Sequence, residues 1–75
     1  MTGEFTVWWW DASDGQHKEL SFVDAQRAVE AAHRLCKGPA ALLGMVKRVI
    51  ITDGGDYTNF EWKHGEGITY PPGHK

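Results

Sequence analysis

Cysteine is almost absent from this chain of 75 residues, in which Cys36 is the only one. A single cysteine cannot form a disulfide within the chain, which excludes a small secreted scaffold held by disulfides and favours a reducing compartment. Long hydrophobic runs are missing too, since no apolar stretch approaches the roughly 20 residues that cross a bilayer. The N-terminal MTGEFTV lacks the basic start and apolar run of a signal peptide. We therefore expect a soluble, cytoplasmic protein, and the initial Met1 is typical of a complete small gene product.

An excess of positive charge is also missing. Eight Lys and Arg residues stand against ten Asp and Glu residues, for a formal net charge of −2. A protein held to nucleic acid mainly by phosphate contacts is usually clearly basic, so this balance argues against that class. Hydrophobic residues make up 41% of the chain and charged residues 24%, which is typical of a globular protein. We expect one domain over residues 1–75, with an ordered core of about residues 4–70 and a flexible tail over residues 71–75.

Alternation and turn residues predict a hairpin at the start of the chain. Residues 4–10 alternate and are rich in aromatic and β-branched types, DASDG supplies turn residues, and an extended pattern resumes with QHKELSF. Helical spacing follows from Asp24, which is a good N-cap, to Gly38, which is a natural stop. The helix carries a stripe of small and apolar side chains on one face. That stripe consists of Ala25, Ala28, Val29, Ala32, Leu35 and Cys36.

The second half of the chain reads as a short helical turn and three strands. Leu42 and Leu43 are expected to close the core from the turn, and MVKRVIIT reads as a central strand that is apolar on both faces. DGGD and HGEG are turns around the strand YTNFEWK, and ITY is a short last strand. The predicted fold class is α+β: strand–strand–helix–strand–strand–strand, a mainly antiparallel sheet with one helix packed on one face. The other face is left open to water or to a partner.

Three consecutive tryptophans end the first expected strand, FTVWWWD. Alternate side chains of a strand lie on opposite faces. Trp9 therefore lies on the same face as Phe5 and Val7, and Trp8 lies on the other face with Trp10. Either set could face the helix. The helical stripe is mostly alanine, so the helix lies close to the sheet and accommodates one indole more easily than two. We therefore expect Trp8 and Trp10 on the open face.

The same alternation in YTNFEWK directs Phe60 and Trp62 to the helix. The open face is then expected to carry aromatic side chains among polar ones. These are Trp8, Trp10 and Tyr57, with Thr6, Arg48, Asn59, Glu61 and Lys63 between them. Two explanations stay open for the aromatics. They either pack against long cross-strand neighbours, for up to about 1 kcal/mol each, or form a binding surface, since exposed aromatics ringed by polar groups concentrate interface energy.

Catalytic and metal-binding patterns are weak. Asp53, Asp56 and Glu61 lack the spacing of a calcium loop, and DGGD between strands is first of all a turn signal. The four histidines share no zinc-ligand spacing. His33 and Cys36 stand three residues apart on the helix, as a base and a nucleophile could, but Cys36 belongs to the apolar stripe and suits the core better. We expect no enzymatic activity, cofactor or metal.

These patterns favour a non-enzymatic binding module. Protein interfaces favour Trp, Tyr and Arg, so we expect a protein partner, or a second copy in a dimer. The expected binding residues are Trp8, Trp10, Tyr57, Arg48 and Lys63. The alternative is single-stranded nucleic acid stacked on the same aromatics, although the acidic turns interrupt the basic groove that such a partner needs. We expect no membrane and no small-molecule substrate.

The expected layout is a hairpin, an Asp-capped helix and a closing set of strands. It is similar to that of many small bacterial and phage-encoded proteins, some of which inhibit host defence complexes, as anti-CRISPR proteins do. The similarity is one of architecture and includes no diagnostic motif. The similarity implies that the expected binding module could be an inhibitor of a host defence complex, such as an anti-CRISPR protein.

Overall fold

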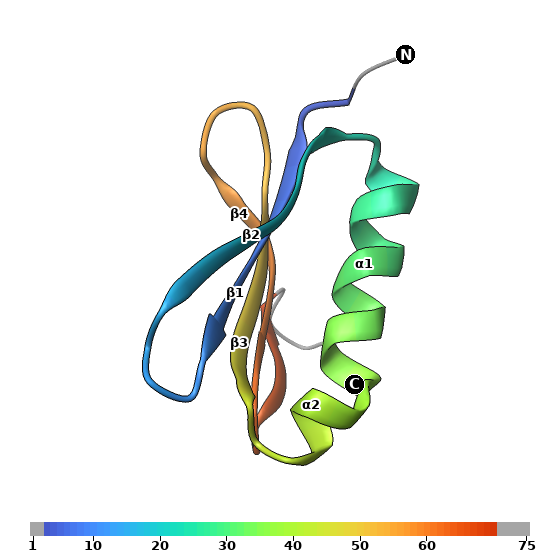
Figure 1. Ribbon diagram of the computed structural model, residues 1–75. Coiled ribbons are helices and arrows are strands. Elements are labelled where there is room, and N and C mark those ends of the chain that lie inside the picture. Colours follow the sequence, from blue (N-terminus) through green and yellow to red (C-terminus); the bar gives the residue numbers. More distant parts are fainter. Residues whose placement is uncertain (1–2, 71–75) are drawn as a thin grey trace.

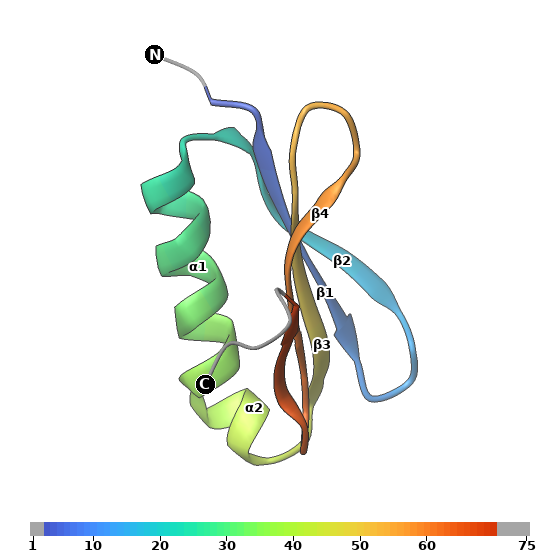
Figure 2. The ribbon, with the colours of Figure 1, turned by 180° about the vertical axis from the view of Figure 1, so that it is seen from behind.

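The computed structural model describes residues 3–70 and shows one open sheet with helices on one side (Figure 1, Figure 2). The elements are β1 (Phe5–Asp11), β2 (Gln16–Val23), α1 (Ala25–Lys37), α2 (Pro39–Leu42), β3 (Val46–Thr52), β4 (Thr58–Lys63) and β5 (Gly67–Tyr70). The spatial order is β2-β1-β3-β4-β5, and every neighbouring pair is antiparallel. This confirms the predicted α+β class and element order. The tail expected at residues 71–75 lies outside the described residues. Within residues 3–70, no helix is long and apolar enough to span a membrane.

Two turns of the same design close the hairpins β1–β2 and β3–β4. Asp11 starts the first, and its carboxylate accepts the backbone N–H groups two and four residues later, both at 2.9 Å. Asp53 starts the second and does the same at 2.9 and 3.1 Å. The fourth residue is Asp14 in one turn and Asp56 in the other, and both have a positive φ, of 66° and 64°. Asp tolerates this left-handed region because its short side chain can bond locally.

Helix α1 begins and ends where the sequence predicts. The Asp24 carboxylate accepts the backbone N–H of Arg27 at 2.8 Å and so caps the first turn. At Gly38 a Cβ would lie 2.8 Å from the Arg34 carbonyl oxygen, so only glycine fits without a shift. The buried helix residues are all alanines, namely Ala28, Ala31 and Ala32. Small side chains on this face allow the helix to lie close to the sheet.

The expected helical stripe needs two corrections. Val29 and Ala25 are predicted in the stripe, but Val29 is 58% exposed and Ala25 is exposed too. Ala31, which lies outside the predicted stripe, is buried. The buried face is therefore centred on Ala28, Ala31 and Ala32, and Val29 lies at its border.

The expectation that Leu42 and Leu43 close the core is wrong. They are 78% and 76% exposed, and Ala41 takes the inward position at 2% exposure. The physical reason is that α2 begins at Pro39 and has only four residues, so only one of its side chains, that of Ala41, is buried in the core. With Met45, which is also exposed, the two leucines form an apolar tip at this end of the molecule.

The core lies between α1 and the central strands. Val7 and Val49 are completely buried, and Phe5 and Trp9 pack against the same cluster. The preferred assignment of β1 is therefore confirmed: Phe5, Val7 and Trp9 face the helix. Trp8 pairs with Ile50, on the opposite face.

The alternation in β4 is interrupted. Ile51 pairs with Phe60 and Thr52 with Thr58, so the register shifts by one residue at Asn59. Asn59 lines a hollow on the helix side, beside Phe60. Its predicted place on the open face is thus wrong, because the bulge breaks the two-residue period on which that prediction rests.

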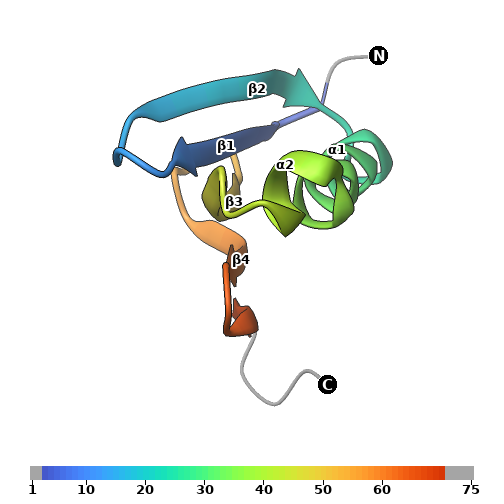
Figure 3. The same cartoon turned by 60° about the horizontal axis from the view of Figure 1, so that its bottom comes forward.

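One helical layer does not cover the whole sheet. Helix α1 packs on β1, β2 and β3. Viewed from the end, the helices lie beside β1 and β3, while β4 and the red β5 strand extend beyond them (Figure 3). Within residues 3–70, the helix-side surface of β4 and β5 therefore lies beyond the strands on which α1 packs.

Candidate functional site

On the open face, both indoles lie beneath long cationic side chains. Lys18 Nζ stands 5.0 Å from the centroid of the Trp8 ring, and Arg48 Cζ stands 4.6 Å from that of Trp10. The Trp8 indole N–H also donates a hydrogen bond to the Thr52 hydroxyl at 3.1 Å. These are cross-strand contacts of the kind that stabilise a sheet. The packing explanation proposed from the sequence therefore describes how the two rings are held.

The Arg48 guanidinium is itself held by a carboxylate. Arg48 Nε donates to Glu61 at 2.6 Å, and the Thr69 hydroxyl donates to the other Glu61 oxygen at 2.8 Å. The Glu61 side chain is only 17% exposed. The Thr69 hydrogen bond, followed by Arg48, holds the pKa of this carboxyl below its usual range, against an opposing effect of burial. Trp10, Arg48, Glu61 and Thr69 thus form one chain of contacts across four strands.

The structure brings together four of the five predicted binding residues. Trp8, Trp10, Arg48 and Lys63 share the open face, and Arg48 pairs directly with Lys63. Tyr57 is exposed but stands apart, in the loop before β4, where it lies over Gly55. That loop is at the opposite end of the β3–β4 hairpin from Lys63.

A hollow of about 370 Å³ opens beside Trp10 on this face. Its basic lining residues are Lys47, Arg48, Lys63 and His64, and its acidic ones are Asp14 and Glu66. Lys47 is paired with Asp14 at 2.7 Å. The charges in the hollow are therefore mixed and partly neutralised.

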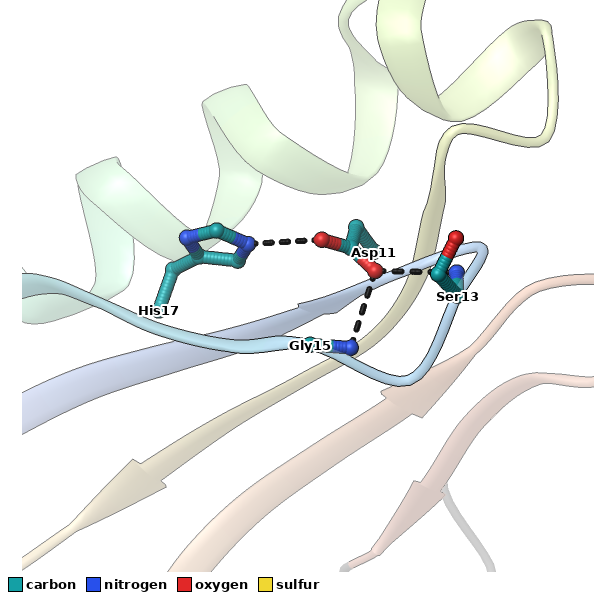
Figure 4. Close-up of polar contacts among 4 residues, drawn as sticks. All are labelled: Asp11, Ser13, Gly15 and His17. Atoms are coloured by element: carbon teal, nitrogen blue, oxygen red, sulfur yellow. Dashed lines mark hydrogen bonds and ion pairs between the residues drawn. The ribbon is translucent and has the colours of Figure 1, made fainter.

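An aspartate and a histidine meet at the β1–β2 turn (Figure 4). His17 Nε2 lies 2.8 Å from an Asp11 oxygen, and the imidazole stacks on Trp9 with ring centroids 4.2 Å apart. The pKa of Asp11 is lowered, first by the His17 hydrogen bond and then by the Gly15 N–H. Ser13 supplies its backbone N–H to Asp11, as Figure 4 shows, so these residues hold the turn closed.

Neither the cysteine nucleophile nor the acidic metal site considered from the sequence is formed in the structure. Cys36 is half-buried, and burial raises the pKa of its thiol to about 11, so it stays protonated at neutral pH, whereas a nucleophile needs the thiolate. The pKa of Asp53 is lowered first by a hydrogen bond from Asn59 and then by the backbone N–H groups of its own turn, so this carboxylate is bound within the turn. Across residues 3–70, no group of three His, Cys, Asp or Glu side chains is arranged to hold a metal ion.

A larger hollow than the one beside Trp10 lies on the other side of the sheet, between α1 and the β4–β5 hairpin. Its volume is about 520 Å³, and its lining is mainly apolar. The lining residues are Val29, His33, Cys36, Lys37, Phe60, Trp62, Gly67 and Ile68. Val29 is 58% exposed and Ile68 is 36% exposed. We call this surface the helix-side groove.

Sequence reasoning missed the helix-side groove, although a signal for it was present. Five strands are expected with one helix, and both large apolar residues of the fourth strand, Phe60 and Trp62, are expected to face that helix. Strands lie about 4.8 Å apart and a helix is about 10 Å wide, so one helix covers two or three strands. Comparison with protein-family models, curated proteins and solved structures gives no match for this chain.

Proposed function

We propose that this chain is a small, non-enzymatic binding module that engages a protein through the helix-side groove. The observation that carries the proposal is the apolar helix-side surface of β4 and β5, which is only partly covered within residues 3–70. Phe60, Trp62 and Ile68 line a groove whose other wall is Val29 of α1. Contiguous exposed apolar surface with a polar border is a common feature of protein interaction sites.

The composition of the groove suits a protein interface. Its centre holds an indole, a phenyl ring and aliphatic side chains, and His33 and Lys37 stand on the helix side. Aromatic residues at the centre of an interface, surrounded by polar ones, supply most of its binding energy. The groove is open along its length, as a site for a macromolecule must be. We keep the predicted cytoplasmic location and the role as an inhibitor of a host complex as parts of this proposal.

The open face is a weaker candidate for the protein partner. Its two indoles are already occupied by Lys18 and Arg48, and binding would require these side chains to move. Displacing a paired guanidinium carries a cost, because its Glu61 partner would lose the charge that it bonds.

Single-stranded nucleic acid remains the second candidate, on the open face. The observation that favours it is the hollow beside Trp10, which is lined by four basic side chains. A base could stack on Trp10 while its phosphate meets Lys63. The acidic residues Asp14 and Glu66 in the same hollow work against this partner.

The first test compares groove variants with a matched control on the opposite edge of the sheet. Val29→Lys and Ile68→Lys place a charge in the groove at exposed positions, and Phe22→Lys places the same charge on β2 at a residue that is 66% exposed. The three immobilised variants and the wild type are used to capture proteins from a lysate of the source cells. We expect specific partners that the Phe22 variant retains and both groove variants lose. Partners that survive both groove variants but are lost on Trp10→Ala would move the interface to the open face.

Nucleic acid is tested separately. The intrinsic tryptophan fluorescence is followed while mixed-sequence single-stranded DNA or RNA is added, at low and at physiological salt. We expect no saturable quenching. Saturable quenching that weakens steeply as salt rises, and that disappears in Trp10→Ala, would replace the protein proposal with the second candidate.

A further inference from the structure

We infer that the occupant of the helix-side groove is an amphipathic α-helix of a partner protein, which lies beside α1 and carries carboxylates on the flank that faces α1. This inference rests on the proposed function and names the partner's chemistry. Four features of the molecule carry it: the width of the sheet, the length of the groove, the charges along it, and the lack of a suitable helix on a second copy.

The width of the sheet leaves room for one more helix. With about 4.8 Å between neighbouring strands, five strands span about 19 Å from the first axis to the last, whereas one helix is about 10 Å wide. Helix α1 packs on β1, β2 and β3, and β4 and β5 extend past it (Figure 3). A second helix beside α1 would cover Phe60, Trp62 and Ile68 and complete the layer.

The groove is long enough for several helical turns. A second hollow of about 330 Å³ lies further along α1, and it shares Val29 and Phe60 with the groove. The two hollows together follow α1 from Ala25 to Lys37. These 13 residues span about 20 Å at 1.5 Å per residue. A partner helix of three to four turns, about 13 residues, matches that length.

The charges along the groove are one-sided. Its two ionisable basic residues are His33 and Lys37, both on α1, and none of its lining residues is a carboxylate. The one other titratable lining residue, Cys36, holds its proton because burial raises the thiol pKa to about 11. The wall formed by β4 and β5 is apolar apart from Asn59 at the far end. An Asp or Glu on the α1-facing flank of a partner helix would meet Lys37, while its apolar face would meet Trp62.

A second copy of this chain does not supply such a helix. The apolar face of α1 is already buried on its own sheet, where Ala28 and Ala32 lie in the core. Helix α2 exposes Leu42, but it has only four residues, about one turn. The occupant is therefore a different protein.

The experiment is a selection from a displayed library of random peptides of about 16 residues, long enough for four helical turns. The wild-type protein is the bait, and peptides that also bind Ile68→Lys are removed. We expect the enriched sequences to carry apolar residues at i, i+3, i+4 and i+7, with Asp or Glu on one flank.

A synthetic peptide of the enriched sequence is then titrated against purified variants. Its affinity should fall at least about tenfold in Ile68→Lys. It should fall about threefold in Lys37→Glu, since an exposed ion pair contributes little, and it should be unchanged in the control Phe22→Lys. Replacing the carboxylates of the peptide by Lys should restore part of its affinity for Lys37→Glu.

Other outcomes separate the two proposals. Groove-dependent peptides with apolar residues at every second position would indicate a strand added to the β5 edge; they would overturn the helix inference and leave the protein-binding proposal standing. The absence of any groove-dependent peptide would overturn both. Loss of peptide binding as the wild-type concentration rises, with a doubled mass by light scattering, would make a second copy the occupant and would also overturn the inference.

Discussion

The two faces of the sheet hold their large aromatic side chains by different kinds of contact. On the open face, Trp8 and Trp10 lie beneath Lys18 and Arg48, and Glu61 in turn fixes Arg48. On the helix side beyond α1, Phe60 and Trp62 pack partly against the core, and the His64 ring meets Trp62 edge-on. Ile68 lies beside them in the groove and is 36% exposed. The comparison shows that the number of tryptophans in a strand does not tell how their rings are held. What matters is whether the neighbouring strands supply side chains that cover the rings.

Covered and uncovered isoleucines on the helix side offer the strongest test of this contrast. Ile51 in β3 is 4% exposed, and Ile68 in β5 is 36% exposed. We expect Ile51→Ala to lower the free energy of unfolding by about 2–5 kcal/mol, because it leaves a cavity in a packed core. Ile68→Ala should cost less than about 1 kcal/mol, since the surface around it is already open. Urea denaturation of both variants measures the difference, and equal losses would show that β5 is packed as tightly as β3.

On the open face, the Trp8 hydrogen bond ties β1 to β3. Trp8→Phe keeps an aromatic ring but removes the indole N–H, so the buried hydroxyl of Thr52 loses its donor. We expect a loss of about 1 kcal/mol in the free energy of unfolding. Trp10→Phe is the matched control, because the ring beneath Arg48 is retained and no such bond is removed. If both variants are equally stable, packing rather than the hydrogen bond holds Trp8.

The third test, with a smaller expected effect, concerns Phe22 at the β2 edge of the sheet. Its side chain is exposed at a point where the backbone is irregular. Phe22 has a φ of 55° at an irregularity of the β1–β2 pairing, in the left-handed region that strains most side chains. Phe22→Gly should relieve that strain and raise the free energy of unfolding by about 0.5 kcal/mol. Phe22→Ala keeps the strain and should not stabilise the protein. Thermal unfolding of the two variants measures the difference between them. If Phe22→Ala also stabilises the protein, the exposed ring and not the backbone strain is the unfavourable feature.

The smallest effect is expected from the carboxylate that fixes Arg48. The pKa of Glu61 is lower in the folded protein than its usual value. Its contribution to stability is therefore complete above the usual pKa of a glutamate and is lost as the pH falls through the lowered value. Glu61→Gln keeps an oxygen for Thr69 but removes the charge beside Arg48. The variant should be less stable than the wild type at neutral pH and equally stable in acid, as urea midpoints across this range would show. A constant difference at every pH would mean that the charge of Glu61 does not matter.

Most of the fold followed from local patterns in the sequence. The N-cap at Asp24, the glycine at the end of α1 and the alternation in β1 each have a physical cause that acts within a few residues. The orientation of the tryptophans also followed, because an alanine face lets the helix lie close to the sheet and leaves space for Trp9 alone.

The remaining features depend on contacts between residues far apart in the sequence, or on the size of whole elements, and no short stretch of sequence shows these. The bulge at Asn59 arises from the pairing of β3 with β4, and the exposure of Leu42 arises from a helix too short to have a period. Four predicted site residues share the open face, yet the Trp8 ring is covered by Lys18, which reaches it from the neighbouring strand. The helix-side groove depends on the width of the whole sheet.

The strand order β2-β1-β3 also has a consequence for how the chain reaches its native state. Strand β1 lies inside the sheet between β2 and β3, and β3 is synthesised more than thirty residues after β1. During synthesis the first hairpin and α1 leave the ribosome with Val7 and Ala28 still without their β3 contacts. Folding therefore waits for a non-local pairing, and loop closure sets its rate. The nascent chain carries an unfinished sheet edge until Thr52 has been added.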